Sequence, residues 1–302
     1  MKESLFFVGP GRMGLALGYA LWQADVVRSL VYCGRRPEPP SHPLFIQGNA
    51  RYVFGLERPG EETTAVFLSV PDDVLAEMAM TLAGQGDAPA GAAAFHLSGA
   101  LNTDPLAPLH ARGYSVGTLH PLQTVAHPVT GADLLPGSHF AVSGEPQAAA
   151  VARRLLSALG SPAVSIPVTR RPLYHAGAVL ASSYVLAILA AASRLLCRAG
   201  VPQDEALGAL LPLTRGTLDN LEKLGPEQAL TGPVPRGDLE TIRLHLRALE
   251  PGERVLYRDL GQELIELVRG HLLEDDVADE LHQVFRTAAE DGENGSEGEE
   301  ER

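Results

Sequence analysis

Three glycines with a fixed spacing give the sequence its clearest phosphate-binding signal. Gly9, Gly11 and Gly14 lie in the run FFVGPGRMG, directly after an apolar segment typical of a strand and at the start of an expected helix. In this context the first glycine makes a tight turn, the second lets the backbone approach a pyrophosphate, and the third lets helix and strand pack closely. The N-terminus of a helix favours negative charge. We therefore expect a dinucleotide to bind at Gly9, Gly11, Arg12, Met13 and Gly14, with a purely structural glycine turn as the alternative.

The residues after the expected second strand indicate which dinucleotide binds. An NAD site usually has a carboxylate at this position, where it binds the ribose 2′-hydroxyl. In this chain Gly34 is followed by Arg35 and Arg36, and guanidinium groups bind a 2′-phosphate well. The pattern favours NADP(H), and a solvated basic turn is the alternative. Val70 and Pro71, which follow another apolar run, are expected beside the nicotinamide ribose.

Polar residues follow two further expected strands and could handle a proton. Ser98 lies in the run FHLSG, and His120 opens the run HPLQT. Hydride transfer to a carbonyl or an imine needs a proton donor, and histidine titrates near neutral pH. We predict His120 as the acid–base group, Ser98 as the residue that orients it, and His175, at the start of a long apolar helix, as an alternative acid. A structural role for each of them is the other interpretation.

The second half of the chain contributes polar residues that could bind an anionic substrate. The irregular run LTGPVPRGD covers residues 230–238 and opens an expected helix. The residues predicted to bind substrate are Ser183, Thr231, Arg236, Asp238 and His245. An Arg236–Asp238 pair that only caps the helix is the alternative. The sequence has no metal-ligand spacing such as HExxH, so we expect no metal site.

The elements that must position these residues change in type along the chain. Expected strands cover residues 5–8, 30–32, 65–70, 93–97, 115–119, 139–143 and 163–168, with helices at 14–23, 74–82 and 146–159. Alternating strands and helices predict a parallel α/β sheet. Beyond that region only helices are expected, at 173–199, 203–224, 236–248, 251–272 and 276–290. We expect a dinucleotide-binding domain over residues 1–168, an all-helical domain for substrate binding and dimerisation over 169–290, and a disordered acidic tail over 291–302.

Composition and charge narrow the class of protein further. The chain has 302 residues, with 24 Lys and Arg against 37 Asp and Glu, and a net charge of −13. It has no basic field to hold a phosphate backbone, which disfavours a nucleic-acid partner. Its two cysteines cannot form a disulfide framework, and its longest apolar stretch is interrupted by Ser182 and Ser183. We expect a cytoplasmic protein that does not bind a membrane.

Three runs resemble the motifs of one bacterial family: LHPLQT at 119–124, YHAGAVLASSY at 174–184 and LTGPVPRGD at 230–238. This family combines a Rossmann-like N-terminal domain with a C-terminal domain of unknown function, DUF2520. The resemblance implies a fold similar to that of 6-phosphogluconate dehydrogenase and pyrroline-5-carboxylate reductase. It also implies a homodimer formed through the helical domain. Members of the family are commonly labelled NADP oxidoreductases.

Two related groups of enzymes bear on the chemistry. Prephenate dehydrogenases place a catalytic His in an HPM-type segment and a Ser on the preceding strand end, and this chain is similar at His120 and Ser98. Ketopantoate reductases and β-hydroxyacid dehydrogenases use a Lys near the start of the long helix. This chain departs from that pattern, because Tyr174 and His175 occupy the region. The resemblance therefore implies that a histidine acts as the acid.

Together these features predict an NADP-dependent oxidoreductase that moves a hydride between NADP(H) and a small carboxylated carbonyl or imine. A ketopantoate-like 2-keto acid is one such substrate. We expect His120 to exchange the proton, Ser98 to orient it and Arg236 to bind the substrate carboxylate. Two alternatives stay open: a catalytically silent NADP-binding sensor or scaffold, and a prephenate-type dehydrogenase.

Overall fold

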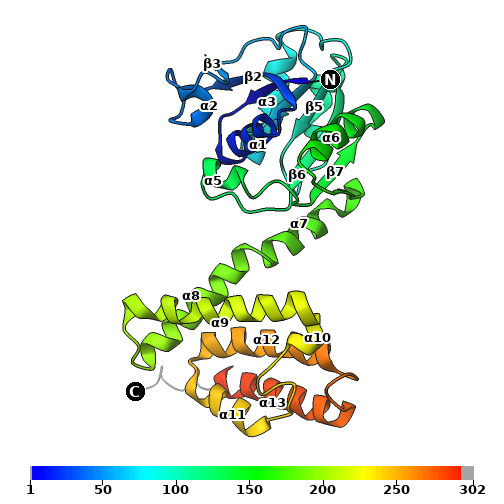
Figure 1. Ribbon diagram of the computed structural model, residues 1–302. Helices are drawn as coiled ribbons and strands as arrows, with labels where there is room; N and C mark the ends of the chain where they lie inside the picture. The colour runs from blue at the N-terminus through cyan, green and yellow to red at the C-terminus, as the bar shows by residue number, and fades with distance from the viewer. Residues whose placement is uncertain (1, 294–302) are drawn as a thin grey trace, which may run out of the picture. The chain divides into compact units, whose positions relative to one another are not determined.

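The computed structural model describes residues 2–293, with side chains described as far as Arg286, and it divides into two compact units (Figure 1). The first unit extends to Tyr184, and the second begins at Val185. The sequence predicts the domain boundary at residue 168, before helix α7 (Arg171–Leu180). The contact boundary lies after this helix, because Arg171 and Tyr174 bond to residues of the sheet and its loops.

One eight-stranded sheet forms the centre of the first unit, with the strand order β3-β2-β1-β4-β5-β6-β7-β8. The strands are β1 (Glu3–Val8), β2 (Val27–Gly34), β3 (Arg51–Phe54), β4 (Ala65–Leu68), β5 (Ala93–His96), β6 (Ser115–Pro121), β7 (Phe140–Gly144) and β8 (Ala163–Ser165). All neighbours are parallel except β6 and β7, which pair antiparallel. The mostly parallel sheet confirms the predicted fold class. The sequence did not predict β3 or the reversed direction of β7.

Helices cover both faces of this sheet. They are α1 (Arg12–Gln23), α2 (Pro43–Ile46), α3 (Leu75–Ala83), α4 (Ala107–His110), α5 (Pro128–Ala132) and α6 (Pro146–Ala158). Successive residues of a strand point to opposite faces; Phe7 of β1 packs in the core with α1 and α6, and Phe6 packs in the core with α3 and α4. Burial on both faces explains why the strands are apolar runs.

Parallel pairing brings several candidate residues to one edge of the sheet. Strands β1, β4, β5 and β6 are consecutive neighbours and run in the same direction. Their carboxyl ends therefore lie side by side, and ligands of open α/β sheets bind in the crevice outside these ends. The glycine run follows β1, and His120 lies near the end of β6.

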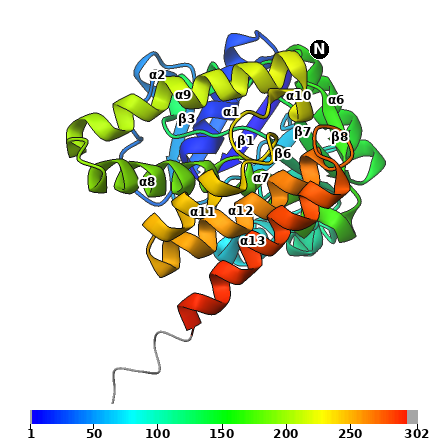
Figure 2. The same cartoon turned by 90° about the horizontal axis from the view of Figure 1, so that it is seen from below.

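The second unit is all-helical, as the sequence predicts. Its helices are α8 (Ser183–Arg198), α9 (Gln203–Leu224), α10 (Pro226–Ala229), α11 (Leu239–Ala248), α12 (Pro251–Val268) and α13 (Asp275–Glu293), of which α8 begins within the first unit. Helices α11, α12 and α13 lie side by side (Figure 2). They share one apolar core that includes Ile242, Ile265 and Phe285. Gly261 of α12 faces the Phe285 ring, which any Cβ would displace.

The helix expected at residues 173–199 is in fact interrupted between α7 and α8. The Ser182 hydroxyl donates to the Ala178 carbonyl at 2.7 Å, a bond that competes with helical geometry. The whole stretch Val168–Arg198 has the length and composition of a membrane span, with a mean hydropathy of 1.8 in its most apolar window. Helices covered by other protein surfaces share these properties, so this is weak support for a span. Residues 291–293, which the sequence predicts to be part of the disordered tail, are instead the last residues of α13. Residues 294–302 of the predicted tail lie outside the described part of the chain.

Candidate functional site

The glycine run forms a tight turn between β1 and α1. Gly9 has a φ of +95°, in the region that favours glycine. A Cβ at Gly9 would come within 2.5 Å of the Ser69 carbonyl oxygen and 2.9 Å of Val70 Cγ1, and a Cβ at Gly14 would come within 2.7 Å of Ser69 Cβ. These two glycines therefore let the turn pack against the loop after β4. A Cβ at Gly11 would meet no atom nearer than 3.6 Å, which leaves room for a ligand.

The N-terminus of α1 presents free backbone donors beside this turn. Gly11 is the N-cap, and the first helical bond runs from the Leu15 N–H to the Gly11 carbonyl at 2.9 Å. The N–H groups of Arg12, Met13 and Gly14 precede that bond. No side chain in the described part of the chain caps this helix, and its first turn holds no acid. The open space at Gly11 and these free N–H groups together fit a pyrophosphate.

Arg35 and Arg36 follow β2 and are both exposed. Neither guanidinium has an ion-pair or hydrogen-bond partner among residues 2–293. The backbone beneath them is held in two places: the Gly55 N–H donates to the Gly34 carbonyl at 2.8 Å, and the Tyr52 hydroxyl donates to the Arg36 carbonyl at 2.6 Å. The two guanidinium groups without partners therefore extend from a turn whose backbone is held in place.

The loop after β4 is tied to the end of β5 by Ser98. The Ser98 hydroxyl donates to Asp72 Oδ2 at 2.7 Å and accepts the N–H groups of Ala100 and Leu101 at 3.3 Å and 3.2 Å. Asp72 directly follows Pro71, so the bond joins the expected cofactor loop to its neighbour. The hydrogen-bond partners of Ser98 do not include His120, the residue that Ser98 is predicted to orient.

His120 forms a cluster with two residues of α7. Its Nδ1 shares a hydrogen bond of 2.8 Å with the Tyr174 hydroxyl, and its ring meets the His175 ring edge-to-face, with centroids 5.6 Å apart. A Cβ at Gly99 would come within 2.8 Å of His120 Nε2 and closer still to His175 Nδ1. The structure thus brings together the predicted His120 and His175, and it adds Tyr174 and Gly99, which sequence reasoning missed.

The buried Arg171 supports this cluster through the backbone of Ser98. The Arg171 side chain is fully buried, its Nη2 donates to the Ser98 carbonyl at 2.6 Å, and its Nη1 donates to the Ser143 hydroxyl at 3.3 Å. Within the described residues it has no carboxylate partner, which is unusual for a buried cation. The guanidinium fixes the backbone at Ser98 and raises the local positive potential. No feature of the sequence distinguishes Arg171 from the solvent-exposed arginine before it.

Burial sets the charge states in the cluster. Burial lowers the pKa of His120 from 6.5 to about 4, and the positive potential of His175 and Arg171 acts in the same direction. Burial also lowers the pKa of His96, whose Nε2 donates to the Asn102 carbonyl at 2.7 Å and whose Nδ1 accepts the Ser98 N–H. Burial raises the pKa of Tyr174. At neutral pH, His120 and Tyr174 are therefore both uncharged.

The residues predicted to bind substrate have mixed surroundings. Asp238 caps α11, because its carboxylate accepts the Thr241 N–H at 3.1 Å and the Thr241 hydroxyl at 2.8 Å, and Arg236 lies 3.8 Å away. These bonds lower the pKa of Asp238, with Thr241 as the largest cause. His245 Nδ1 shares a 2.7 Å hydrogen bond with the Tyr257 hydroxyl. The remaining two, Thr231 and Ser183, are exposed.

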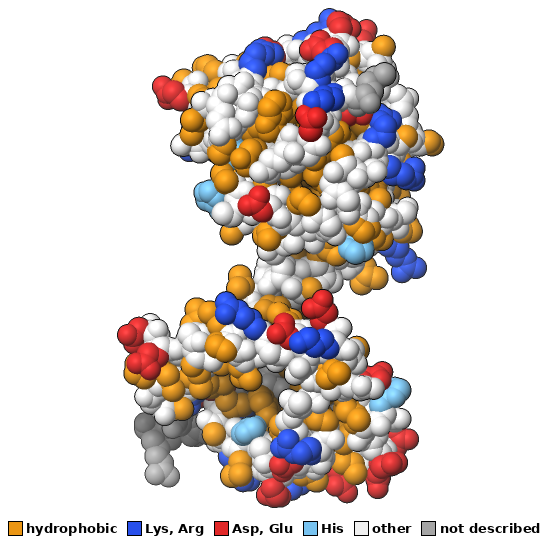
Figure 3. All heavy atoms as spheres, in the orientation of Figure 1, with side chains coloured by type: hydrophobic (Ala, Val, Ile, Leu, Met, Phe, Trp, Pro, Cys, Tyr) orange, Lys and Arg blue, Asp and Glu red, His pale blue; other side chains and the backbone are white. Residues whose placement is uncertain are grey.

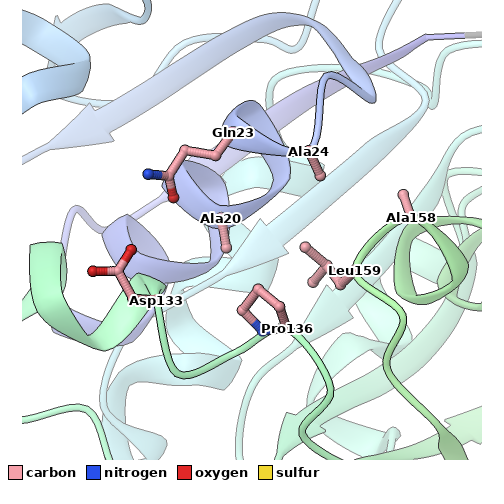
Figure 4. A pocket seen from close by; sticks show the side chains of 7 residues that line it. All are labelled: Ala20, Gln23, Ala24, Asp133, Pro136, Ala158 and Leu159. Atoms are coloured by element: carbon pink, nitrogen blue, oxygen red, sulfur yellow. The ribbon is translucent and has the colours of Figure 1, made fainter.

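A shallow depression of about 320 Å³ lies at the far end of α1 from the glycine run (Figure 4). It is lined by Ala20, Gln23, Ala24, Asp133, Pro136, Ala158 and Leu159. Only two of these side chains are polar, so the depression offers little chemistry. No group of three or more His, Cys, Asp or Glu side chains among the described residues could hold a metal ion.

The fold and the glycine turn define a class of proteins in which a Rossmann-like domain precedes a helical domain. The chain matches the family model of the Rossmann-like domain over residues 2–121 and that of DUF2520, a domain of unknown function, over residues 138–264. It therefore carries both domains, which confirms the resemblance based on its motifs. His120 lies in the first match and Tyr174 in the second, so their hydrogen bond joins the two. A comparison with curated proteins gave no match.

Several solved structures share this fold. BF3122 from Bacteroides fragilis, provisionally described as an NADP oxidoreductase, is 23% identical with a TM-score of 0.68, over 88% of this chain and 98% of that one. The protein TM1727 from Thermotoga maritima is 22% identical with a TM-score of 0.61, over 96% and 99%. Pyrroline carboxylate reductase from Plasmodium falciparum, solved with NADP bound, is 13% identical with a TM-score of 0.56, over 96% and 98%. At these identities the likeness establishes a fold that NADP-binding oxidoreductases use.

Proposed function

We propose that the chain is an NADP(H)-dependent oxidoreductase that transfers a hydride between the nicotinamide and a small carboxylated carbonyl or imine. One observation carries the proposal: the open N-terminus of α1 and His120, which is hydrogen-bonded to Tyr174 of α7, lie at the carboxyl ends of strands in one sheet. Ligands of open α/β sheets bind in the crevice at that edge. The Ser98–Asp72 bond joins the loops that lie between the two.

The cofactor is NADP(H) in this proposal because of the turn after β2. Arg35 and Arg36 are exposed and unpaired among the described residues, and residues 34–37 of the sequence include no acid that could bind a ribose 2′-hydroxyl. Paired guanidinium groups match the geometry of a phosphate. The presence of NADP in the Plasmodium falciparum reductase, which shares the fold, supports this choice.

NADPH, when bound, supplies a hydride to the substrate carbon. His120 then gives a proton from one ring nitrogen to the substrate oxygen or nitrogen, while its Nδ1 takes the proton of the Tyr174 hydroxyl. The 2.8 Å hydrogen bond provides the path, and Tyr174 regains a proton from solvent. This route suits a histidine that is uncharged at neutral pH, because the ring never has to hold two protons. His175, with its buried and unpaired Nδ1, stays the alternative acid.

Ser98 and Arg171 position the His120–Tyr174 pair through the backbone. The Ser98 hydroxyl holds the loop after β5, and the Arg171 guanidinium holds the Ser98 carbonyl. Gly99, the next residue, lies against His120. We propose that this fixes the imidazole in place. The arrangement differs from a direct Ser–His contact, so it supports the general reductase over the prephenate-type alternative.

The substrate carboxylate would bind Arg236, whose guanidinium is exposed and only 3.8 Å from Asp238. Thr231, Ser183 and His245 are the further candidates for substrate contacts. A ketopantoate-like 2-keto acid has the required carbonyl and carboxylate. A carboxylate away from the reacting carbon is bound alike in the ground state and the transition state, so we expect Arg236 to affect KM more than kcat.

The proposal also includes a homodimer formed through the helical domain. Helix α8 is apolar, yet none of its residues is buried within the chain. Six leucines of α9 are exposed as well: Leu207, Leu211, Leu213, Leu218, Leu221 and Leu224. Figure 3 shows hydrophobic side chains, in orange, on the surface of the helical unit. Contiguous apolar surface of this kind marks an interface. Sedimentation of the purified chain tests the dimer, and a monomer at micromolar concentration would contradict it.

A substrate screen tests the proposed activity. The purified chain is incubated with NADPH or NADH and a panel of 2-keto acids and imines, and the loss of reduced-cofactor absorbance is followed. We expect turnover with at least one member and a preference for NADPH. Tight NADPH binding without any turnover would favour the silent sensor. Oxidation of prephenate or arogenate with NADP would favour the prephenate-type enzyme.

A further inference from the structure

We propose that Tyr52 determines cofactor specificity by holding the Arg35–Arg36 turn in the shape that binds a 2′-phosphate. Its ring also explains why β2 ends in glycine instead of the carboxylate of an NAD site. This inference rests on the proposed NADP(H) function and concerns a residue of β3 that is not itself a phosphate ligand. Tyr52 is therefore a positioning residue.

The Tyr52 side chain reaches the turn from the neighbouring strand. In the parallel register of β2 and β3, Tyr52 pairs with Tyr32 and Phe54 pairs with Gly34. The Tyr52 hydroxyl donates to the Arg36 carbonyl at 2.6 Å. The bond fixes the backbone of one of the two arginines, although both guanidinium groups stay free among the described residues. A fixed backbone lowers the entropy lost when long side chains close on an anion.

The same tyrosine occupies the space that a side chain at residue 34 would need. A Cβ at Gly34 would come within 2.9 Å of Tyr52 Cε2 and 3.0 Å of Cζ, and it would collide with the hydroxyl. An Asp or Glu at this position would displace the ring and break its bond to Arg36. The carboxylate that an NAD site uses and the tyrosine of this turn are therefore mutually exclusive.

The ring of Tyr52 is itself held by aromatic packing that leads back to the glycine turn. Tyr52 meets Phe45 edge-to-face at 5.7 Å, and Phe45 meets Tyr32 at 5.5 Å. The Tyr32 hydroxyl donates to the Gly14 carbonyl at 3.0 Å. Aromatic pairs of this geometry keep their rings in place. A change of Tyr52 to Phe should keep the ring and remove only the bond to the turn.

The test measures cofactor affinity, so it needs no substrate. Dissociation constants for NADPH and NADH are compared in the parent chain, in Tyr52→Phe and in Tyr114→Phe. Tyr114 directly precedes β6, which is five strands away from β3 in the sheet order, and it serves as the control tyrosine remote from the turn. Loss of one hydrogen bond should weaken NADPH about three- to tenfold in Tyr52→Phe. NADH binding should stay within about twofold, as should both cofactors in the control.

Competition with 2′,5′-ADP and 5′-AMP provides a second reading of the same effect. Tyr52→Phe should weaken only the ligand that carries the 2′-phosphate. Equal losses for both ligands, or no loss for either, would overturn the role of Tyr52 while leaving the NADP(H) function intact. A parent chain that binds neither NADPH nor 2′,5′-ADP would overturn the proposed function, and the inference with it.

A variant at Gly34 tests the second half of the inference. Gly34→Asp alone should weaken NADPH by at least tenfold without improving NADH, because the new side chain displaces Tyr52. Adding Tyr52→Val should free the space and improve NADH binding over Gly34→Asp. If Gly34→Asp alone creates a good NADH site, the tyrosine and the carboxylate are compatible and the inference is wrong.

Discussion

The two halves of the candidate site are built in different ways. The cofactor half is shaped by absent side chains: Gly9 and Gly14 let the backbone of two loops meet, and Gly11 leaves open space. The half that would handle the proton is shaped by buried polar side chains, with Arg171 beneath Ser98 and His120 against Tyr174. A site made of backbone tolerates few changes at its glycines. A site made of side chains depends on a network in which each member positions the next.

This difference makes the two halves separable by experiment. The glycine turn and the Arg35–Arg36 turn do not share a hydrogen bond with His120 or Tyr174 in the described part of the chain. A variant in one half should therefore leave the other half working. Substitutions that are more than about 7–10 Å apart and share no partner usually have additive effects.

The largest effect is expected for His120→Ala. Removal of an acid–base group should lower kcat by about 10²–10⁴-fold for an identified substrate. NADPH affinity should stay unchanged, because the cofactor half makes no contact with this ring. Steady-state kinetics and a cofactor titration measure the two effects. An equal loss in NADPH affinity would show that the two halves are one site.

Tyr174→Phe and His175→Ala test which residue supplies the proton. Tyr174→Phe removes the 2.8 Å partner of His120, so kcat should fall about tenfold or more if the proton passes through this bond. If His175→Ala abolishes turnover while His120→Ala retains most of it, His175 is the acid.

The next effect in size belongs to the cofactor half. Arg35→Ala combined with Arg36→Ala should weaken NADPH by roughly 1.5–3 kcal/mol, since hydrogen bonds to charged groups are worth about this much. NADH should bind almost as before. Isothermal titration with both cofactors measures the difference, and an equal loss for NADH and NADPH would remove the case for NADP.

A smaller loss is expected in stability when Gly99 receives a side chain. A Cβ at this position would press on His120 and His175, and overpacking of this kind costs about 1–3 kcal/mol. Gly177→Ala is the matched control, because a Cβ at that helical position would meet no atom within 4 Å. We expect denaturant unfolding to show a loss for Gly99→Ala and none for Gly177→Ala. Equal stabilities would mean that the two imidazoles move freely.

A pH dependence of stability is expected as well. The unfolded chain protonates His120 near its ordinary pKa of 6.5, whereas the folded chain does so only at about 4. Between these values the unfolded state binds more protons, so the free energy of unfolding falls as the pH is lowered through this window. His120→Gln should lose less stability over the same range. Equal losses in the two chains would mean that His120 titrates normally.

Most of the cofactor half of the site could be predicted from the sequence, but little of the half that would handle the proton could be. Gly9, Gly11 and Gly14 lie close together in the chain, and a side chain at Gly9 or Gly14 would clash with the loop after β4, so their spacing is a strong signal. Arg171 and Gly99 carry no such mark, because their roles depend on contacts between segments far apart in the sequence. His120 could be predicted from its residue type and its place at the end of a strand, but its hydrogen bond to Tyr174 could not.

The fold also has features that the sequence predicts and features that it does not. Long apolar runs predicted the buried strands and α9 with its bounds, because periodicity and burial are local signals. The edge strand β3, which carries Tyr52, is short and half-exposed, so it has no such pattern. The antiparallel β7 could not be recognised either, since direction depends on the connection and not on the strand's own residues.

Deuterium transfer from labelled NADPH shows whether this site moves a hydride. NADPH carrying deuterium at the transferable C4 position is incubated with the chain and the keto acid and imine panel, and the products are analysed by mass spectrometry. We expect a product with one deuterium on the former carbonyl or imine carbon, formed at least about 10²-fold more slowly by His120→Ala. Full retention of deuterium on bound NADPH with every member of the panel would contradict the claim that this site transfers a hydride.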